Sequence, residues 1–598
     1  MNTDKKTIDD REFFLNFSLF WVIFGALSLF SALGNFFYAW IFIVYIFLGL
    51  FYLAWTFQKN KRKLSLSKNF LITNGIFFIF VLLFSFFSTP TVFSGRDQGS
   101  ISNAAIELSH NHKLEFSNKA STEFFSIYGP GKALNFPGFY YTKNGDLTTQ
   151  FPLGYISWLA AFFSLFGITG LVIANSVTLF IFLSSFYLLG KELFGKEYSN
   201  LMLAFTLTSF SFIWFFKYTL SENLAMALLW VIILAVFYLI KNPNRKLFFL
   251  YLLAISLLIF TRIEGYAFFI TSISALLITK KSREFIKENY KPIFYAILIF
   301  TIIFLLNLQK DFPFFKQIIK ASLDSISETT TNSNDLVRKF IFPGINILQI
   351  HFIYGLLGFL IVGFFGILKI LRKKQFSILI PLFVAFPALI YIVESKISSD
   401  HPWMLRRFVF AVLPIMILYS VYAIRYLKNS LSEKYSFFLK YSYSIIIIIL
   451  LASNIIPFTR YAFYKNDEEL LQETENISKK FSSNDLILID RLASGNGWSM
   501  ISGPMMTIFK KQAVYFFNIN DIKKINLKKF DNVYLIIPEE KISFYAASEI
   551  GNQLDIIEKY TLKTTKVSTQ IKNNLISLIK YPEKETTETD GYILKLNK

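Results

Sequence analysis

The chain has 598 residues, of which 54% are hydrophobic, 19% aromatic and only 17% charged. Soluble proteins average about 25% charged residues, so this composition indicates a polytopic membrane protein and excludes a single soluble domain. The absence of Cys excludes disulfides and thiol catalysis, and the presence of only four His argues against a His-rich metal centre. The formal net charge of +21 comes largely from short Lys and Arg clusters between apolar runs. That distribution follows the positive-inside rule and does not indicate nucleic-acid binding.

The N-terminal region, residues 1–89, contains three apolar runs at 15–33, 36–57 and 69–88. A spanning helix needs about 20 mostly apolar residues, so each run predicts a transmembrane helix. No small-residue cleavage site follows the first run, which we therefore interpret as a retained helix. The stretch 58–68 is rich in Lys and Arg, which places it with the N-terminus in the cytoplasm and the end of the third helix outside.

Residues 90–169 form the predicted first extracytoplasmic loop. Within it, the stretch 100–109 predicts a short amphipathic helix, and several Gly, Pro and Asn pairs predict turns. The run 151–167 is apolar but short, and Pro152 is its second residue. The next run, 170–190, is followed by Lys191 and Lys196, which would face outside if both runs crossed the bilayer. We therefore interpret 151–167 as a juxtamembrane or re-entrant helix at the outer face.

Residues 170–458 form the predicted transmembrane bundle, and residues 459–598 a soluble α/β extracytoplasmic domain. The spans after 170–190 are 200–217, 221–240, 247–260, 264–280, 292–308, 346–370, 376–393, 408–427 and 441–458. This assignment gives about 13 transmembrane helices, puts the basic clusters on the side of the N-terminus, and makes 309–345 an outer loop. Short β-rich runs in the tail predict strands. These runs are DLILID, AVYFFNI, NVYLIIP, LISLIKY and GYILKLN.

The first outer loop carries acids that the membrane does not explain. Charged residues near a bilayer are expensive, so those that remain are functional candidates. Asp97 stands beside Arg96 at the mouth of the third helix, as a catalytic carboxylate or as the N-cap of the helix that follows. Arg96 binds substrate or pairs with a neighbouring acid. Asp146, in KNGD, is a second candidate or a plain turn residue. His110 and His112 form an H-x-H pair, but no third ligand is near, so we predict no metal site there.

The helix ends on the outer side carry three further candidates. Glu222 begins the run at 221–240, where an acid also suits the positive end of the helix dipole. Arg262 and Glu264 lie between two apolar runs, where they form a local ion pair or bind a charged substrate.

The stretch SDHPWMLRRFVF contains the strongest candidates for substrate-binding residues. Asp400, His401, Arg406 and Arg407 precede a span on the outer side, where adjacent arginines run against the positive-inside bias. Arginine binds phosphate bidentately, so the pair predicts a phosphate site, and interfacial anchoring is the alternative.

These stretches resemble parts of the GT-C superfamily of polytopic glycosyltransferases, in particular the branch of protein O-mannosyltransferases and lipid A aminoarabinose transferases. The stretch SGRDQGSISNAAIEL is similar to the acid and the helix that begin the first outer loop in this family. The stretch QFPLGYISWLAAFFSLFG is similar to the apolar helix that follows that loop. SENLAMALLW, TRIEG and DHPWMLRRFVFAVLP resemble later helix ends. Protein mannosyltransferases carry an Asp-Glu pair where this chain has Asp97 and Gln98, and the oligosaccharyltransferase motif W-W-D-Y-G is not found in the tail.

The resemblance implies a fold and a reaction. The implied fold is an α-helical, GT-C-like polytopic membrane protein with a small C-terminal α/β domain. The implied reaction moves a sugar from a polyprenyl-phosphate donor to an acceptor hydroxyl of a lipid, glycan or protein at the outer face. It inverts the anomeric centre and uses Asp97 as general base. Its expected partners are this donor and membrane lipids, and no cofactor is certain, although a divalent cation remains open. A transporter or lipid flippase, and a non-catalytic scaffold, are the competing classes; convergence of Asp97, Arg262 and Arg406 on one outer cavity would favour the enzyme.

Overall fold

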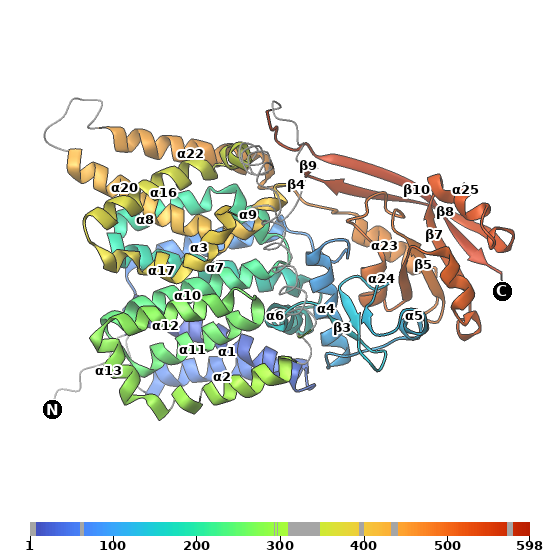
Figure 1. The fold of residues 1–598 in the computed structure, drawn as a ribbon, viewed down its shortest axis with the longest axis horizontal. Coiled ribbons are helices and arrows are strands. Elements are labelled where there is room, and N and C mark those ends of the chain that lie inside the picture. The colour runs from blue at the N-terminus through green and yellow to red at the C-terminus, as the bar shows by residue number, and fades with distance from the viewer. Residues whose placement is uncertain are drawn as a thin grey trace, which may run out of the picture.

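The computed structural model describes residues 8–59, 65–291, 293–295, 297–308, 312, 347–393, 400–431, 441–570 and 578–597. A bundle of helices occupies one end of the molecule and a sheet-containing C-terminal domain the other, with the N-terminus at the far end of the bundle (Figure 1). The predicted fold class, a helical polytopic membrane protein with a C-terminal α/β domain, is therefore confirmed. The predicted outer loop 309–345 lies outside the described residues, apart from Phe312.

The bundle is built from long apolar helices and from several that are bent or short. Its main helices are α1 (Asp10–Leu33), α2 (Ala39–Lys59), α3 (Lys68–Phe86), α7 (Thr169–Phe194), α8 (Lys196–Leu207), α9 (Phe210–Phe216), α10 (Ser221–Lys241), α11 (Arg245–Thr261), α12 (Gly265–Ile278), α13 (Lys280–Glu288), α16 (Leu356–Arg372), α17 (Ile380–Ala385), α18 (Ile390–Val393), α19 (Arg406–Val409), α20 (Val412–Leu431) and α22 (Ser442–Tyr461). Within the described residues, five helices are long and apolar enough to cross a membrane, or nine if each bent pair counts as one span.

Several predicted spans are not single straight helices. The run 200–217 divides into α8 and α9, which meet at 59°. The run 346–370 breaks at Gly355, whose φ of 77° lies in the left-handed region that favours glycine, and its two parts meet at 98°. The run 376–393 alternates short α and 3₁₀ pieces and contains Pro381 and Pro387, each of which removes a main-chain donor.

The first outer loop packs between the bundle and the C-terminal domain. It contains α4 (Asp97–Asn111), α5 (Lys119–Tyr128), a small sheet of β1 (Gly131–Lys132), β2 (Phe139–Tyr141) and β3 (Leu147–Thr149), and then α6 (Leu153–Phe166). The predicted helix at 100–109 is present but begins earlier, and it is buried from Gln98 to Ser109, not amphipathic at a surface. At the other end of α7, Lys191 pairs with Asp10 at 3.0 Å, which sets that end beside the start of α1.

The C-terminal domain is a five-stranded mixed sheet in the order β6-β5-β7-β10-β8. Its elements are α23 (Leu470–Ser478), β5 (Leu486–Asp490), α24 (Ser502–Thr507), β6 (Gln512–Phe516), β7 (Val533–Pro538), α25 (Ile542–Ala546), β8 (Leu554–Lys566) and β10 (Glu585–Leu596). Four of the predicted strands are present. The fifth, LISLIKY, is wrong for 578–581, which are not in a strand, and its other residues lie outside the described ranges. Strand β8 was missed, because its alternating Lys, Glu and Thr lack an apolar run.

The C-terminal domain joins the bundle through a short main-chain ladder. Strand β4 (Asp400–His401) pairs antiparallel with β9 (Thr569–Gln570), so the late outer loop is continuous with the tail (Figure 1). Tyr461, at the end of α22, donates a hydrogen bond to the carbonyl of Pro582 at 2.7 Å. These contacts hold the domain over the end of the bundle that carries the candidate residues.

Candidate functional site

Four helix ends meet beneath the C-terminal domain and carry the predicted charged residues. They are the start of α4, the start of α10, the junction between α11 and α12, and α19. Helix α4 begins at Asp97, its N-cap position is Arg96, and no side chain caps it. The N-cap interpretation of Asp97 is therefore wrong. The carboxylate lies in the first turn of α4 and is free to serve another partner.

An ionic network of alternating acids and bases links these ends. Asp97 accepts a hydrogen bond from Arg406 Nη1 at 2.8 Å, and Arg406 Nε lies 3.2 Å from Glu222 Oε1. The same Glu222 oxygen is 2.9 Å from Arg262 Nη1, and Arg262 Nη2 is 2.6 Å from Glu264 Oε1. Five residues from four separate segments of the chain therefore form one connected network.

Burial differs strongly along the network. The Glu222 side chain is only 3% exposed, whereas that of Asp97 is 47% exposed. A buried carboxylate needs cations around it, because removing one partner of a buried pair typically costs about 3–5 kcal/mol. Arg262 and Arg406 supply those cations to Glu222. Asp97 is thus the solvent-facing end of the network, and Glu222 is its buried anchor.

Arg407 is oriented by a ring and not by an acid. Its guanidinium carbon lies 5.2 Å from the ring centroid of Tyr391, whose hydroxyl in turn donates a hydrogen bond to Glu264. Within the described ranges, no carboxylate forms an ion pair with Arg407. Its Nε is buried and has no hydrogen-bond partner among the described residues, so Arg407 is a candidate for binding an anionic ligand.

Arg96 belongs to a second ion pair beside the first. Its Nη2 donates a hydrogen bond to Asp400 Oδ2 at 2.6 Å. The guanidinium carbon lies 4.7 Å from the ring centroid of Trp403 and 4.4 Å from that of Trp498. Arg96 is therefore held by an acid and by two indoles. The arginine that pairs with Asp97 is Arg406 and not Arg96.

Two predicted site residues lie apart from this network. His401 is buried and shares a 2.9 Å hydrogen bond with the Tyr354 hydroxyl, and burial lowers the pKa of His401 to about 4. Asp146 closes the β2–β3 turn, where its N–H donates to Thr142 Oγ1 at 3.2 Å. Neither residue lines the pocket at Asp97.

An open pocket of about 210 Å³ lies at Asp97, and we call it the Asp97 pocket. Its walls combine the first outer loop, α19 and its preceding turn, and the C-terminal domain. The lining residues are Gly95, Arg96, Asp97, Gln98, Trp403, Arg406 and Trp498. A carboxylate, an arginine paired with it and two aromatic rings therefore border the same space.

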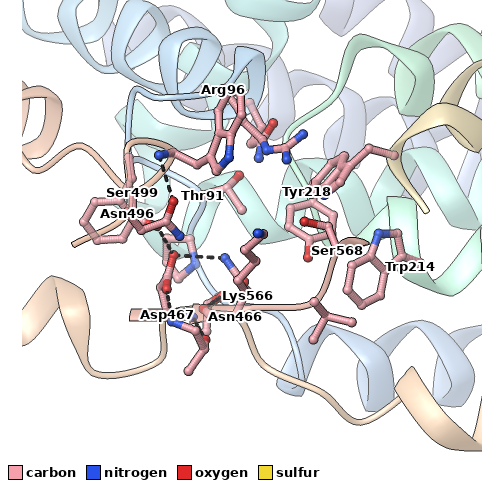
Figure 2. Close-up of a pocket in the computed structure, with 18 residues that line it drawn as sticks. Thr91, Arg96, Trp214, Tyr218, Asn466, Asp467, Asn496, Ser499, Lys566 and Ser568 are labelled. Atoms are coloured by element: carbon pink, nitrogen blue, oxygen red, sulfur yellow. Dashed lines mark hydrogen bonds between the residues drawn. The ribbon is translucent and has the colours of Figure 1, made fainter. Parts of the chain in front are cut away.

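A second, smaller pocket of about 50 Å³ adjoins the first, because Arg96, Gln98, Trp403 and Trp498 line both. We call it the interface pocket, since its wall is shared between the bundle and the C-terminal domain. Figure 2 shows Trp214, Tyr218 and Ser568 on one side of it and Asp467, Asn496 and Ser499 on the other, with Arg96 above.

The residues that sequence reasoning missed come from the C-terminal domain. Trp498 lies in the stretch SGNGW, which follows β5. Two glycines and an asparagine directly before a tryptophan indicate a tight loop with an aromatic tip, so a local signal existed. Nothing in the sequence indicated that this loop would reach Arg96, some 400 positions earlier in the chain.

The donor set does not fit a divalent cation. Among the described residues, no group of three or more His, Asp or Glu is arranged to hold a metal ion. Asp97, which lines the Asp97 pocket, is paired with Arg406, and Asp400 is paired with Arg96.

Comparisons with known proteins gave likenesses of structure only. No family model and no curated protein matches the sequence. ArnT from Cupriavidus metallidurans in the apo state is similar at 10% identity, over 81% of this chain and 96% of that chain, with a TM-score of 0.46. The same protein bound to undecaprenyl phosphate is similar at 8% identity, over 87% and 97%, with a TM-score of 0.44.

An oligosaccharyltransferase from Archaeoglobus fulgidus, in complex with Zn and sulfate, is similar at 12% identity, over 79% of this chain and 70% of that chain, with a TM-score of 0.44.

Proposed function

We propose that the chain is a glycosyltransferase. It moves a sugar from a polyprenyl-phosphate donor to an acceptor hydroxyl at the outer membrane face, with inversion and with Asp97 as general base. The observation that carries this proposal is the pairing of a half-exposed Asp97 with Arg406 at the edge of an open pocket. A base and a phosphate-binding cation are the two groups that such a reaction needs side by side.

The convergence of the charged residues favours an enzyme over the competing classes. Asp97, Glu222, Arg262 and Arg406 belong to one network at one end of the bundle. A transporter would be expected to place such residues at mid-membrane between two gates, and a scaffold would not require them to meet.

The base acts on the acceptor. Asp97 accepts the proton of the acceptor hydroxyl while the hydroxyl oxygen bonds to the anomeric carbon of the donor. The bond from that carbon to the phosphate oxygen breaks, and the polyprenyl phosphate leaves with the electron pair. One displacement occurs from the face opposite the leaving group, so the configuration inverts.

The arginines act on the leaving group. Arg406 and Arg407 can both donate to phosphate oxygens, and charge-assisted hydrogen bonds of this kind are roughly twice as strong as neutral ones. A phosphate bound to Arg406 also competes with Asp97 for the same guanidinium. Donor binding therefore weakens the Asp97 pair and makes the carboxylate available to the acceptor.

Asp97→Asn tests the proposal directly. The variant keeps the size and the hydrogen bond to Arg406 but cannot take a proton, so we expect transfer to fall by about 100-fold or more. The measurement is release of undecaprenyl phosphate from a panel of undecaprenyl-phosphate hexoses by purified enzyme in nanodiscs. Glu115→Gln, which neutralises an exposed acid of the same loop, is the control and should leave the rate unchanged. A near-normal rate for Asp97→Asn would remove Asp97 as the base.

A further inference from the structure

The C-terminal domain reaches into the site through one loop, Arg491–Met500, which we call the Trp498 loop. The N–H of Ser94 donates to the carbonyl of Met500 at 3.3 Å. The main chain of Trp498 lies so close to Gly95 that a Cβ on Gly95 would overlap it. The loop and the start of the first outer loop therefore form one continuous wall beside Asp97.

The Trp498 loop is rigidly built. Trp498 N–H donates to Asn496 Oδ1 at 3.0 Å, and Ser494 Oγ donates to the carbonyl of Ser499 at 2.8 Å. Gly495 has a φ of 69°, which a residue with a side chain rarely adopts. The turn fixes the main chain that carries Trp498, and the guanidinium of Arg96 packs against the indole, so the ring is positioned before any ligand arrives.

The indole of Trp498 is the most exposed apolar surface of the Asp97 pocket wall. It is 42% exposed, whereas Trp403 across the pocket is buried. Arg96 covers part of one indole face. The remaining apolar surface borders the pocket, next to the carboxylate that takes the acceptor proton. A flat amphipathic surface of this kind suits a ligand with both C–H faces and hydroxyls.

The adjoining interface pocket carries buried polar atoms without partners. Within the described part of the chain, these atoms include Gln98 Oε1, Trp214 Nε1 and Ser568 Oγ. Each of the three residues is more than nine-tenths buried. Leaving such a group unsatisfied is unfavourable, so a ligand or water that satisfies all three is favoured. The Gln98 oxygen accepts, the Trp214 N–H donates and the Ser568 hydroxyl does both. Hydroxyl groups can satisfy all three, whereas a purely anionic or purely cationic group cannot.

The charged groups around the interface pocket already have ionic or hydrogen-bond partners. Arg96 pairs with Asp400, and Lys566 lies 3.8 Å from Glu585. Asp467 accepts from Ser499 Oγ at 2.9 Å and from the Thr565 N–H at 2.8 Å. A neutral, hydroxyl-rich group therefore fits this pocket better than a phosphate does, because the basic residues here are already paired and Asp467 would repel an anion.

We infer that the Trp498 loop binds a glycosyl group of the acceptor, with Trp498 as the stacking surface and as a specificity-determining residue. This inference rests on the proposed function and narrows the acceptor to a glycan or glycolipid. The acceptor takes this place because the donor is anchored in the membrane and its phosphate is expected at Arg406. The C-terminal domain, which supplies Trp498 and Ser568, lies beyond the end of the bundle (Figure 1).

The test uses full-length protein in nanodiscs and a panel of methyl glycosides of hexoses and N-acetylhexosamines as probes. Binding is measured by saturation-transfer NMR and titration. We expect at least one glycoside to bind, Trp498→Ala to weaken it by about tenfold, and Trp498→Phe to retain most of the affinity. Phe544→Ala, which removes an exposed ring elsewhere in the same domain, should have no effect. The absence of binding by every glycoside, or equal binding by Trp498→Ala, overturns the inference.

Two further experiments are needed. The first distinguishes an acceptor sugar from a donor sugar at Trp498, and the second distinguishes this inference from the assignment of Asp97 as the base. Saturating undecaprenyl phosphate-hexose should leave methyl glycoside binding intact, because donor and acceptor occupy the site together. Loss of binding would assign the surface to the donor sugar and overturn the inference. Asp97→Asn should still bind the glycoside. Normal transfer by Asp97→Asn together with Trp498-dependent glycoside binding would overturn the base assignment and leave this inference standing.

Discussion

The single residues of this site differ in burial, and the proposed function gives them different roles. Glu222 is buried between Arg262 and Arg406 and faces no pocket opening, so it orients the arginines. Asp97 is half-exposed and lines the Asp97 pocket, so in the proposed reaction it is the residue that meets the acceptor. The same residue types therefore have different roles because they differ in burial, not in chemistry.

Arg407→Ala and Arg406→Ala should separate two roles of the arginines, phosphate binding and stabilisation of the buried Glu222. Arg407→Ala should weaken undecaprenyl phosphate binding by about tenfold with little change in thermal stability, because it forms no ion pair with a described carboxylate. Arg406→Ala should weaken binding and also lower the unfolding midpoint, because Glu222 then loses one of its two cations. Binding is measured by native mass spectrometry. Arg372→Ala, on an exposed arginine at the end of α16, is the control, and unchanged binding by both test variants would exclude a phosphate site here.

Glu107 gives the first outer loop a pH dependence. Burial in α4 raises the pKa of Glu107 to about 7, although Asn111 donates to it at 2.7 Å. The folded state therefore holds a proton between about pH 4.5 and 7 that the unfolded state releases. The resulting stability is complete below that window and is lost as the pH rises through 7, at up to about 1.4 kcal/mol per pH unit. Glu107→Gln should raise the unfolding midpoint at pH 8 but not at pH 4.5. An equal change at both pH values would contradict the assignment.

At the scale of elements, helix ends and loops make the site, and the helices themselves only position it. Helices α4, α10 and α12 each begin at the site, and the Trp498 loop closes it from the other domain. Asp467, which follows α22, also holds the loop in place. It accepts hydrogen bonds from the Thr565 N–H on β8 and from the Ser499 hydroxyl in the loop.

Gly95→Ala should displace the Trp498 loop. Its new Cβ would overlap the main chain of Trp498, so the loop must move away from the pocket. A misplacement of about 1 Å in an enzyme site can cost about 100-fold in rate, and we expect a loss of that order in transfer. Gly75→Ala in α3 is the matched control, because no atom lies within 4 Å of its added Cβ. If Gly95→Ala transfers at the rate of Gly75→Ala, the loop does not form part of the working site.

At the scale of the whole molecule, the two ends differ in chemistry. The basic helix α13 lies at the end of the bundle that carries the N-terminus, and the C-terminal domain lies at the other end (Figure 1). From the positive-inside rule we predict that the first end lies in the cytoplasm and the second outside.

This orientation is directly testable, because the natural chain contains no Cys. Asp590→Cys in the C-terminal domain should react with a membrane-impermeant maleimide in intact cells. Lys281→Cys in α13 should react only after the membrane is permeabilised. Both positions are exposed. The opposite labelling pattern would invert the topology and place the Asp97 pocket in the cytoplasm.

The sequence by itself determined the membrane character, the position of most helices and most of the charged candidates. Long apolar runs must be buried in lipid, and charges beside them are too costly to be incidental. Asp97, Glu222, Arg262, Glu264 and Arg406 were therefore recognisable one at a time. Their local alternatives, such as a cap or an isolated ion pair, were equally compatible with the spacing.

Only the tertiary structure decided which candidates meet. Contacts between Asp97 and Arg406 span about 300 positions, and no local pattern specifies them. The bends at 208–209 and Gly355, the exclusion of Asp146, and the arrival of Trp498 depend likewise on how helices and domains pack. A local sequence pattern reports burial and backbone preference, whereas a site requires side chains from distant segments to share one space.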